Sequence, residues 1–444
     1  MAGYEPLISL LRLEATQLYE EGRDIDRAAA NARIDACGTD KTALMAFYGE
    51  MQQAPMREGF AYSEPTELDG IKAECDFPQE EAYTAIDADR FHGAWLGRCI
   101  GCAIGQPVEG WSAEKITEWY KNAGKYPIRG FVPTVSGTER NEGGATDEKI
   151  CRMPTDDDIR YTVLNYLVQR SHGADFNSCD VAEMWLHKLP FREVCTAETQ
   201  AYLNFANIDG ILPWSRVPNA MELMREAKVN TYLNPYREWI GAQIRADAFG
   251  YIQAGMPGKA AEAAYKDAWF SHVKNGIYGE MFFAAMIAAA FTESSLDECF
   301  FKALAVVPKK SRFYEAALAA RESALAATDR AEYIAQVIAE AKKYHPVHTI
   351  NNAQICISAM FFCRGDFRES VCFAIECGFD TDCNGATIGS VLGALHGAAG
   401  IPADLKEPLN DEFSTGIVPY ENYSISRFAA ECSSLRDELY KHNA

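Results

Sequence analysis

The stretch DRFHGAWLGRCIGCAIGQPVE, residues 89–109, carries a glycine at every fourth position of its central part, at Gly93, Gly97, Gly101 and Gly105. Positions four apart lie on one face of an α-helix, so these glycines form a stripe along which a second helix can pack very closely. The helical pattern breaks at Gly105 and Pro107, and Glu109 follows in a loop. A carboxyl group there can act as an acid, a base or a gate, although a glutamate taken alone is more often an ordinary surface residue.

Helical periodicity extends over most of the chain beyond this stretch, and we predict an all-α fold. The helices predicted for the main part of the chain cover residues 89–104, 156–170, 177–189, 258–270, 278–292, 312–342, 351–364, 368–377, 384–398 and 425–442. Extended runs are few. Residues 128–135 are predicted to form a short strand pair, followed by a glycine-rich loop over residues 136–146.

The pattern also predicts how the chain is divided. Residues 5–52 carry helical periodicity, and the segment that follows is rich in prolines and acidic residues without periodicity, which is typical of a connecting arm. We therefore expect an N-terminal helical extension with its linker over residues 1–85 and a main domain over residues 86–444. Residues 190–240, with many Asn, Pro and aromatic residues, are interpreted as an insertion that covers a cleft.

Composition and charge restrict the partners of the chain. Its 444 residues, 48% hydrophobic and 24% charged, are typical of a globular protein with a large core. The formal net charge of -21 disfavours nucleic acid, because binding to phosphates normally requires a basic surface. An anionic small molecule would need local cations, a metal ion or backbone N–H groups in order to bind so acidic a protein.

Targeting features and cysteine usage indicate a cytoplasmic protein. Residues 1–12 lack the pattern of a signal peptide, and the apolar runs are too short or too rich in glycine to span a bilayer. The 14 cysteines follow no disulfide framework, so we expect reduced thiols. Cys99 and Cys102 form a CxxC pair without a second pair at zinc-finger spacing, which favours core packing for both. The oligomeric state is left open.

Three consecutive aspartates precede a predicted helix in the segment Pro154-Thr155-Asp156-Asp157-Asp158. The ordinary interpretation is a helix start, with Thr155 as N-cap and the carboxylates favoured by the helix dipole. Three aspartates exceed what capping needs, and unit charges 4 Å apart repel by roughly 4 kcal/mol at an effective dielectric of 20. A bound cation would relieve this repulsion.

A second acidic helix start, GFDTDCNGAT, covers residues 378–387. Asp380 and Asp382 can converge on one side of a turn whose backbone is held by glycine, as in metal loops with oxygen ligands, although another N-cap is an equal alternative. Two helices aimed at one point would bring four carboxylates together. Hard oxygen ligands of this kind select Mg²⁺ or Mn²⁺, and the eight histidines show no metal-ligand spacing.

The three segments, in this order and at these separations, resemble the ADP-ribosylglycohydrolase family over about residues 86–405. The family's D-R-x-x-G-x-x-x-G and G-D-A-x-G-x-P-x-E patterns are matched by residues 89–109. Its T-D-D segment is matched by residues 155–157, and its D-T-D-[ST]-N segment by residues 380–384.

The resemblance implies a compact orthogonal bundle of helices with a magnesium site of one or two ions at the floor of a cleft for ADP-ribose. The metal ligands that it implies are Thr155, Asp156, Asp157, Asp380 and Asp382.

The resemblance further implies substrate-binding residues. Residues 240–245 are similar to the family's glycine-rich phosphate loop, which assigns substrate contacts to Gly241, Ala242 and Gln243. Ser271-His272 matches its substrate-contacting histidine, although a histidine ahead of an apolar helix is more often a cap or core residue.

Two departures from the family pattern fall inside its motifs. Cys383 stands where the family usually has a hydroxyl residue that binds a metal, and a thiol is a poor partner for Mg²⁺. Cys102 replaces the usual aspartate of the G-D-A-x-G run, so a supporting carboxylate is missing near Glu109. We expect a weaker second metal and an altered substrate preference.

The function predicted from the sequence is magnesium-dependent hydrolysis of the glycosidic bond of an ADP-ribosyl conjugate, either an ADP-ribosylated protein side chain or a small molecule. Asp380 and Asp382 are expected to hold the metal and orient water, and Glu109 to act as acid, base or gate. The alternatives are hydrolysis of a simpler riboside or another glycoside in nutrient metabolism, and a non-catalytic ADP-ribose-binding protein.

Overall fold

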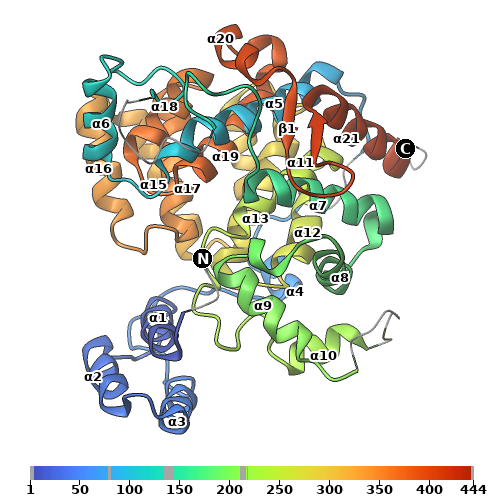
Figure 1. Ribbon diagram of the computed structural model, residues 1–444. Helices are drawn as coiled ribbons and strands as arrows, with labels where there is room; N and C mark the ends of the chain where they lie inside the picture. The colour runs from blue at the N-terminus through green and yellow to red at the C-terminus, as the bar shows by residue number, and fades with distance from the viewer. Residues whose placement is uncertain (1–4, 79–81, 135–143, 211–216, 218, 442–444) are drawn as a thin grey trace.

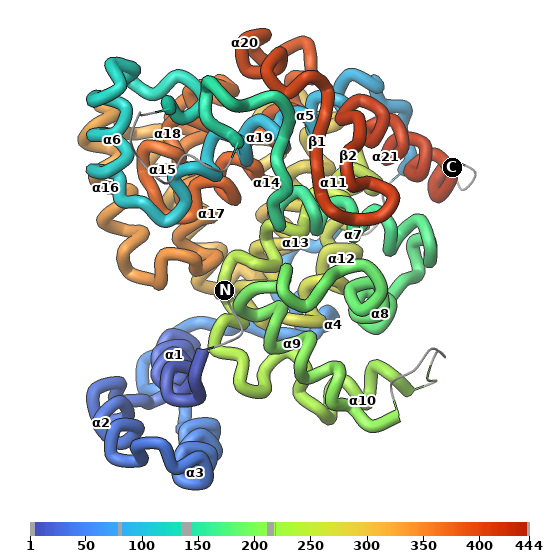
Figure 2. The backbone as a smooth tube through the Cα atoms, in the orientation of Figure 1, coloured from blue at the N-terminus to red at the C-terminus, as the bar shows by residue number. Residues whose placement is uncertain are grey.

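The N-terminal part of the chain forms three short helices. In the computed structural model, which describes residues 5–78, 82–134, 144–210, 217 and 219–441, these are α1 (Leu7–Glu20), α2 (Arg27–Cys37) and α3 (Lys41–Met51). They share a small core of their own, which includes Leu11, Ile34 and Leu44. Figures 1 and 2 show them at one end of the molecule, beside the larger body.

The rest of the described chain is also helical, which confirms the all-α prediction. The arm after α3 contains α4 (Leu68–Ala73). The body is formed by α5 (Ala88–Gly105), α6 (Ala113–Asn122), α7 (Asp157–His172), α8 (Ser178–Lys188), α9 (Thr196–Ala206), α10 (Ala220–Glu226), α11 (Asp247–Ile252), α12 (Pro257–Ala268), α13 (Lys274–Ala290), α14 (Leu296–Leu304), α15 (Arg312–Ala326), α16 (Arg330–Ala341), α17 (Thr349–Phe362), α18 (Phe367–Cys377), α19 (Thr381–His396), α20 (Ala403–Lys406) and α21 (Ile425–Tyr440). A two-stranded antiparallel sheet pairs β1 (Glu412–Ser414) with β2 (Asn422–Ser424).

The glycine stripe of α5 lies directly against a second glycine stripe on α19. A Cβ atom built on Gly97 would lie 2.1 Å from the carbonyl oxygen of Gly389, and one built on Gly101 would lie 1.9 Å from that of Gly385. The same crowding holds at Gly93, where a Cβ would lie 2.3 Å from the Gly393 oxygen. The predicted close approach of a second helix is therefore confirmed, and the two helices run antiparallel with their backbones in contact.

The expected strand pair at residues 128–135 is wrong in the part that the structure describes. Residues 128–134 form no strand, and Val135 with most of the glycine-rich loop lies outside the described residues. Pro133 has no N–H group to donate to a ladder. The Val132 carbonyl instead accepts from Asp147 N at 3.0 Å, and Ile128 and Val132 are buried.

The expected single helix over residues 312–342 is also wrong, because α15 ends at Ala326 and α16 begins at Arg330. Asp329 caps α16, with its side chain accepting from Glu332 N at 2.9 Å. Periodicity continues across the break, since both helices turn an apolar face to the same core, and the cap is the local signal that separates them.

Buried polar contacts join α1 to the body. Arg237, which is 3% exposed, donates to Glu14 Oε2 at 2.8 Å and to Glu21 Oε1 at 2.6 Å. Gln17 Nε2 donates to Glu238 Oε2 at 2.7 Å. These contacts, which we call the α1 clamp, fix the extension to the segment that leads into residues 240–245. Of the expected insertion at residues 190–240, the structure describes α9, α10 and this clamp segment.

No helix in the described part of the chain combines the length and the apolar character that a bilayer crossing demands. All 14 cysteines lie within the described ranges, and each is free of a disulfide.

Candidate metal centre

The α5–α19 pair brings Glu109 next to the second acidic helix start. The Thr381 hydroxyl donates to Gly105 O at 2.9 Å, so the end of α5 touches the beginning of α19. The loop beyond α5 then pairs with the loop before α19, because Gly110 N donates to Phe379 O at 3.0 Å. As a result, carboxylate oxygens of Glu109, Asp380 and Asp382 lie within 4.8 Å of one another.

The first acidic segment enters the same site from α7. Asp156, and not Thr155, is the N-cap of this helix, and its Oδ1 accepts from Asp158 N at 3.1 Å. Its Oδ2 accepts from Gln106 Nε2 at 2.7 Å. Gln106 follows the glycine stripe, so the start of α7 is tied to the end of α5. Thr155 is exposed, and its hydroxyl accepts from Arg160 Nη2 at 3.4 Å.

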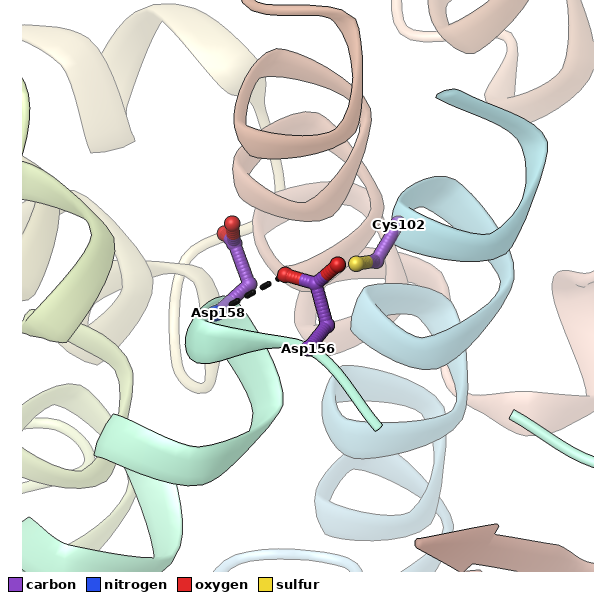
Figure 3. A group of neighbouring side chains, drawn as sticks. All are labelled: Cys102, Asp156 and Asp158. Carbon is purple, nitrogen blue, oxygen red and sulfur yellow. Dashed lines mark hydrogen bonds between the residues drawn. The ribbon is translucent and has the colours of Figure 1, made fainter. Parts of the chain in front are cut away.

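The two acidic helix starts meet. Oxygens of Asp158 and Asp382 and the Cys383 sulfur lie within 4.8 Å of one another, as do oxygens of Asp156 and Asp158 and the Cys102 sulfur. Figure 3 shows the second group, with the two aspartates at the start of α7 and Cys102 reaching toward them from α5. The site is therefore assembled from segments that lie more than 200 residues apart. We call the acidic residues together the carboxylate cluster: Glu109, Asp156, Asp157, Asp158, Asp380 and Asp382.

The electrostatics of the carboxylate cluster fit a cation. Burial and the adjacent Asp156 carboxylate raise the pKa of Asp157 to about 7. Glu109 has access to solvent on one side, yet its partial burial and the carboxylates of Asp380 and Asp157 raise its pKa to about 7 as well. Burial, followed by the charges of Glu109 and Asp156, raises the pKa of Asp382 well above its usual value.

Three oxygens of the carboxylate cluster are buried without a hydrogen-bond partner among the described residues: Asp158 Oδ2, Asp380 Oδ1 and Asp382 Oδ1. Unsatisfied buried oxygens of charged groups are costly, and a cation is the partner that removes this cost. The donor set consists of oxygens apart from two thiols, which suits a hard divalent ion. The residues present therefore fit a metal.

Arg98 is a residue that the sequence did not single out. It lies in α5, is fully buried, and forms ion pairs through Nη2 with Asp158 Oδ1 at 3.0 Å and through Nη1 with Asp247 Oδ2 at 2.6 Å. The third aspartate of the run is thus bound to a protein cation and anchors the start of α7. The signal in the sequence was an arginine inside an otherwise small and apolar helix.

Cys102 and Cys383, the two cysteines that depart from the family pattern, both border the carboxylate cluster. Burial, with the nearby carboxylates, raises the pKa of Cys102 and of Cys383 well above the usual thiol value. Both thiols therefore stay protonated near neutral pH. A protonated thiol in place of a hydroxyl or carboxylate removes a hard ligand from this side of the site.

The glycine-rich segment lies beside the start of α7. Gly241 has no room for a side chain, because a Cβ there would lie 2.2 Å from Glu198 Oε1. Ala242 is buried, and Gln243, also buried, accepts from the Thr349 hydroxyl at 3.0 Å. The N–H groups of Gly241 and Ala242 donate to no acceptor within the described ranges.

His272 lies behind this segment and has no exposed surface. Its Nδ1 is 2.8 Å from the Ser271 hydroxyl, which itself accepts from Arg245 Nη2 at 3.0 Å. Burial and the Arg245 charge lower the pKa of His272 well below its usual value, so the ring is neutral. The structure thus places His272 in a buried network with Ser271 and Arg245.

Glu198 is a second residue that the sequence did not indicate. It is 2% exposed and accepts from Arg245 Nη1 at 2.6 Å. Burial raises its pKa to about 7, and the charge of Asp157 adds to this. It therefore connects the glycine-rich segment with the carboxylate cluster, and no local pattern around position 198 predicts this role.

An all-α fold in which two distant acidic helix starts meet at a carboxylate cluster defines a helical protein with a site that could hold a metal ion. A family model described as ADP-ribosylglycohydrolase matches residues 83–440, which include all three segments of the site. The chain belongs to the ADP-ribosylglycohydrolase family, as the sequence motifs indicate.

Individual relatives are distant. An uncharacterized protein of Archaeoglobus fulgidus is 23% identical over 331 residues, which cover 73% of this chain and 92% of that protein. A solved structure described as an ADP-ribosylglycohydrolase-related protein complex is 18% identical, with a TM-score of 0.47, and the match covers 80% of this chain and 99% of that one.

Proposed function

We propose that the protein is a magnesium-dependent hydrolase that cleaves the glycosidic bond of an ADP-ribosyl conjugate. The observation that carries the proposal is the meeting of the two acidic helix starts, with unpartnered buried oxygens on Asp158, Asp380 and Asp382. The 14 free thiols support a reducing cytoplasm as its location.

The metal would be held by Asp156, Asp157, Asp380 and Asp382, with Thr155 at the exposed edge. One or two Mg²⁺ ions, or Mn²⁺, would supply charge stabilisation and an acidified water at the anomeric carbon. A second ion would bind more weakly than the first, because the protonated thiol of Cys383 replaces a hard ligand.

Glu109 would transfer the proton. Its carboxyl group lies at the solvent side of the carboxylate cluster, and a pKa of about 7 suits a group that both donates and accepts protons near neutral pH. A cavity of about 250 Å³ is lined by Gly110, Trp111 and Phe379 among others, and Gly110 follows Glu109 directly in the chain. Aromatic side chains in this lining would pack against a ring of the substrate.

The glycine-rich segment would hold the phosphates. The free N–H groups of Gly241 and Ala242 are donors for anionic oxygens, and they lie beside a site whose own charge is strongly negative. Gln243, held by Thr349, would fix the shape of this segment. In so acidic a protein, such neutral donors allow a pyrophosphate to bind.

Turnover by the variant Asp380→Ala tests the proposal. Wild type with Mg²⁺ is expected to release ADP-ribose from at least one member of a panel of ADP-ribosylated peptides and O-acetyl-ADP-ribose, measured by chromatography. Asp380→Ala should reduce turnover more than 100-fold without a change in helical circular dichroism. The control Asp404→Asn, which removes an exposed carboxylate, should retain full activity. Unchanged activity of Asp380→Ala would reject the assignment.

A simpler riboside or another glycoside is the second candidate, and the thiols of Cys102 and Cys383 beside the carboxylates favour it. Nucleosides added to the same panel separate the two substrates. A non-catalytic ADP-ribose binder would show tight binding in calorimetry without product from any conjugate.

A further inference from the structure

A second cleft lies between the N-terminal extension and the body. Its volume is about 700 Å³, against about 250 Å³ for the cavity beside Glu109. Its walls come from the end of α1, from residues 57–62 of the arm, and from residues 309–315 and 343–344 of the body. We call it the extension cleft. None of the residues of the carboxylate cluster lines it.

The charge of the extension cleft is opposite to that of the protein. The chain has a net charge of -21, yet the cleft is lined by Arg57, Lys309, Lys310, Arg312 and Lys343, against three acidic residues, Glu20, Glu58 and Glu315. Arg57 and Lys310 form no ion pair with a carboxylate in the described part of the chain. Two cations without a carboxylate partner at one cleft attract an anion, because no acidic side chain neutralises their charge.

The cleft also presents aromatic rings. The Arg57 guanidinium lies 4.3 Å from the centroid of the Tyr19 ring and 5.9 Å from that of Phe60. Phe60 is held in place, because its ring lies over Gly22, where a Cβ would come within 2.4 Å of it. Tyr62 and Tyr344 add two further rings to the lining. Rings beside a guanidinium form a surface on which a flat heterocycle stacks.

Arg312 forms a rigid wall of the cleft. It is 6% exposed and donates to Glu64 Oε2 at 2.8 Å and to Glu238 Oε1 at 2.8 Å. The hydroxyl of Tyr344, which also lines the cleft, forms a hydrogen bond with this guanidinium. Positive charge and aromatic rings therefore coincide at one place.

We propose that the extension cleft is a second ligand site, which binds a phosphorylated aromatic metabolite of the nucleoside monophosphate class. The ring packs among the aromatic side chains of Phe60, Tyr62 and Tyr344 that line the cleft, and the phosphate faces Arg57 and Lys310. Such a ligand contacts the extension and the body at once, so it strengthens their association. This site is independent of the substrate proposed for the carboxylate cluster.

Calorimetric titration of the full chain with AMP tests the site. The variant Arg57→Ala/Lys310→Ala removes the two free cations, and the matched control Arg427→Ala/Lys441→Ala removes the same charge from exposed positions at α21. We expect at least a tenfold rise in the Kd for AMP in the cleft variant and less than a twofold change in the control. Inorganic phosphate and adenosine should each bind wild type at least tenfold more weakly than AMP.

Two further variants separate the alternatives. Asp380→Ala should bind AMP as wild type does, since no residue of the carboxylate cluster lines the extension cleft. Loss of AMP binding in this variant would overturn the proposal. Lys310→Glu, an exposed-position change that leaves the α1 packing intact, should abolish binding. Retained affinity in either cleft variant, equal loss in the α21 control, or no binding to wild type would each overturn it.

Discussion

Replacing Gly101 with alanine perturbs the contact between α5 and α19 at its tightest point. The new Cβ would lie 1.9 Å from Gly385 O and 2.3 Å from its carbonyl carbon. Ordinary contact begins at 3.4 Å, so the backbones must separate by about 1.5 Å. The approach is equally close on either side, because a Cβ built on Gly97 or Gly105 would lie 2.1 Å or 2.2 Å from a carbonyl oxygen of α19.

The size of the effect follows from two opposing terms. Alanine gains about 1 kcal/mol over glycine in helix propensity, whereas overpacking a close-packed core costs about 1–3 kcal/mol and more where the backbone itself is the obstacle. We expect a net loss of about 2 kcal/mol in the free energy of unfolding. Because α5 leads to Glu109 and α19 begins beside Asp380, Mg²⁺ affinity should fall as well.

Guanidinium unfolding followed by circular dichroism measures this loss, and calorimetry measures the Mg²⁺ affinity. The matched control is Gly49→Ala in α3, where a Cβ meets nothing within 4 Å. It should raise the free energy of unfolding by up to about 1 kcal/mol. A Gly101→Ala protein as stable as wild type, beside a Gly49→Ala protein that behaves as expected, would refute the reasoning.

Three other predictions concern the carboxylate cluster, the α1 clamp and the thiol of Cys383. Glu109 and Asp157 have pKa values of about 7 in the folded protein, so they stay protonated at pH values where the same groups of the unfolded chain are already ionised. Their contribution to stability is therefore lost as the pH rises through 7. The rise in Tm on adding Mg²⁺ to chelator-treated protein should consequently be larger at pH 8 than at pH 6. Arg237→Ala leaves Glu14 buried without a cation and leaves Glu21 with Lys274 alone, so it should cost about 3–5 kcal/mol and expose α1 to proteolysis. Arg33→Ala, in an exposed pair, should cost less than about 1 kcal/mol. Cys383→Ser restores a hard ligand and should tighten Mg²⁺ binding severalfold in calorimetry, and an unchanged Kd would remove this thiol from the metal site.

The sequence was sufficient to predict the fold class and to predict that α5 packs closely against another helix. The four-residue glycine spacing on α5 predicted a close neighbour, because helix geometry is local. It did not identify α19 as that neighbour, although Gly385, Gly389 and Gly393 carry the same spacing. Pairing of two stripes is a tertiary choice, which a pattern within one segment leaves open.

Only part of the site could be predicted from the sequence, for the same reason. The acidic helix starts at Asp156 and Asp380 were visible as local excess charge. Arg98 and Glu198 were not, because each acts through a buried partner remote in sequence, Asp158 and Arg245 respectively. Buried ion pairs carry no spacing signal, and they become visible only when the chain is folded.

The glycine-to-glycine contact between α5 and α19 also limits how this family member can change over time. In an ordinary core, a larger residue on one helix can be accommodated by a smaller one opposite. Here the atoms that block a Cβ on Gly97 or Gly101 are main-chain carbonyl groups, which every amino acid possesses. No side-chain substitution on α19 can therefore make room for a Cβ at Gly97 or Gly101. A library that randomises both sides together should therefore return glycine at these positions on each helix independently, without compensating pairs.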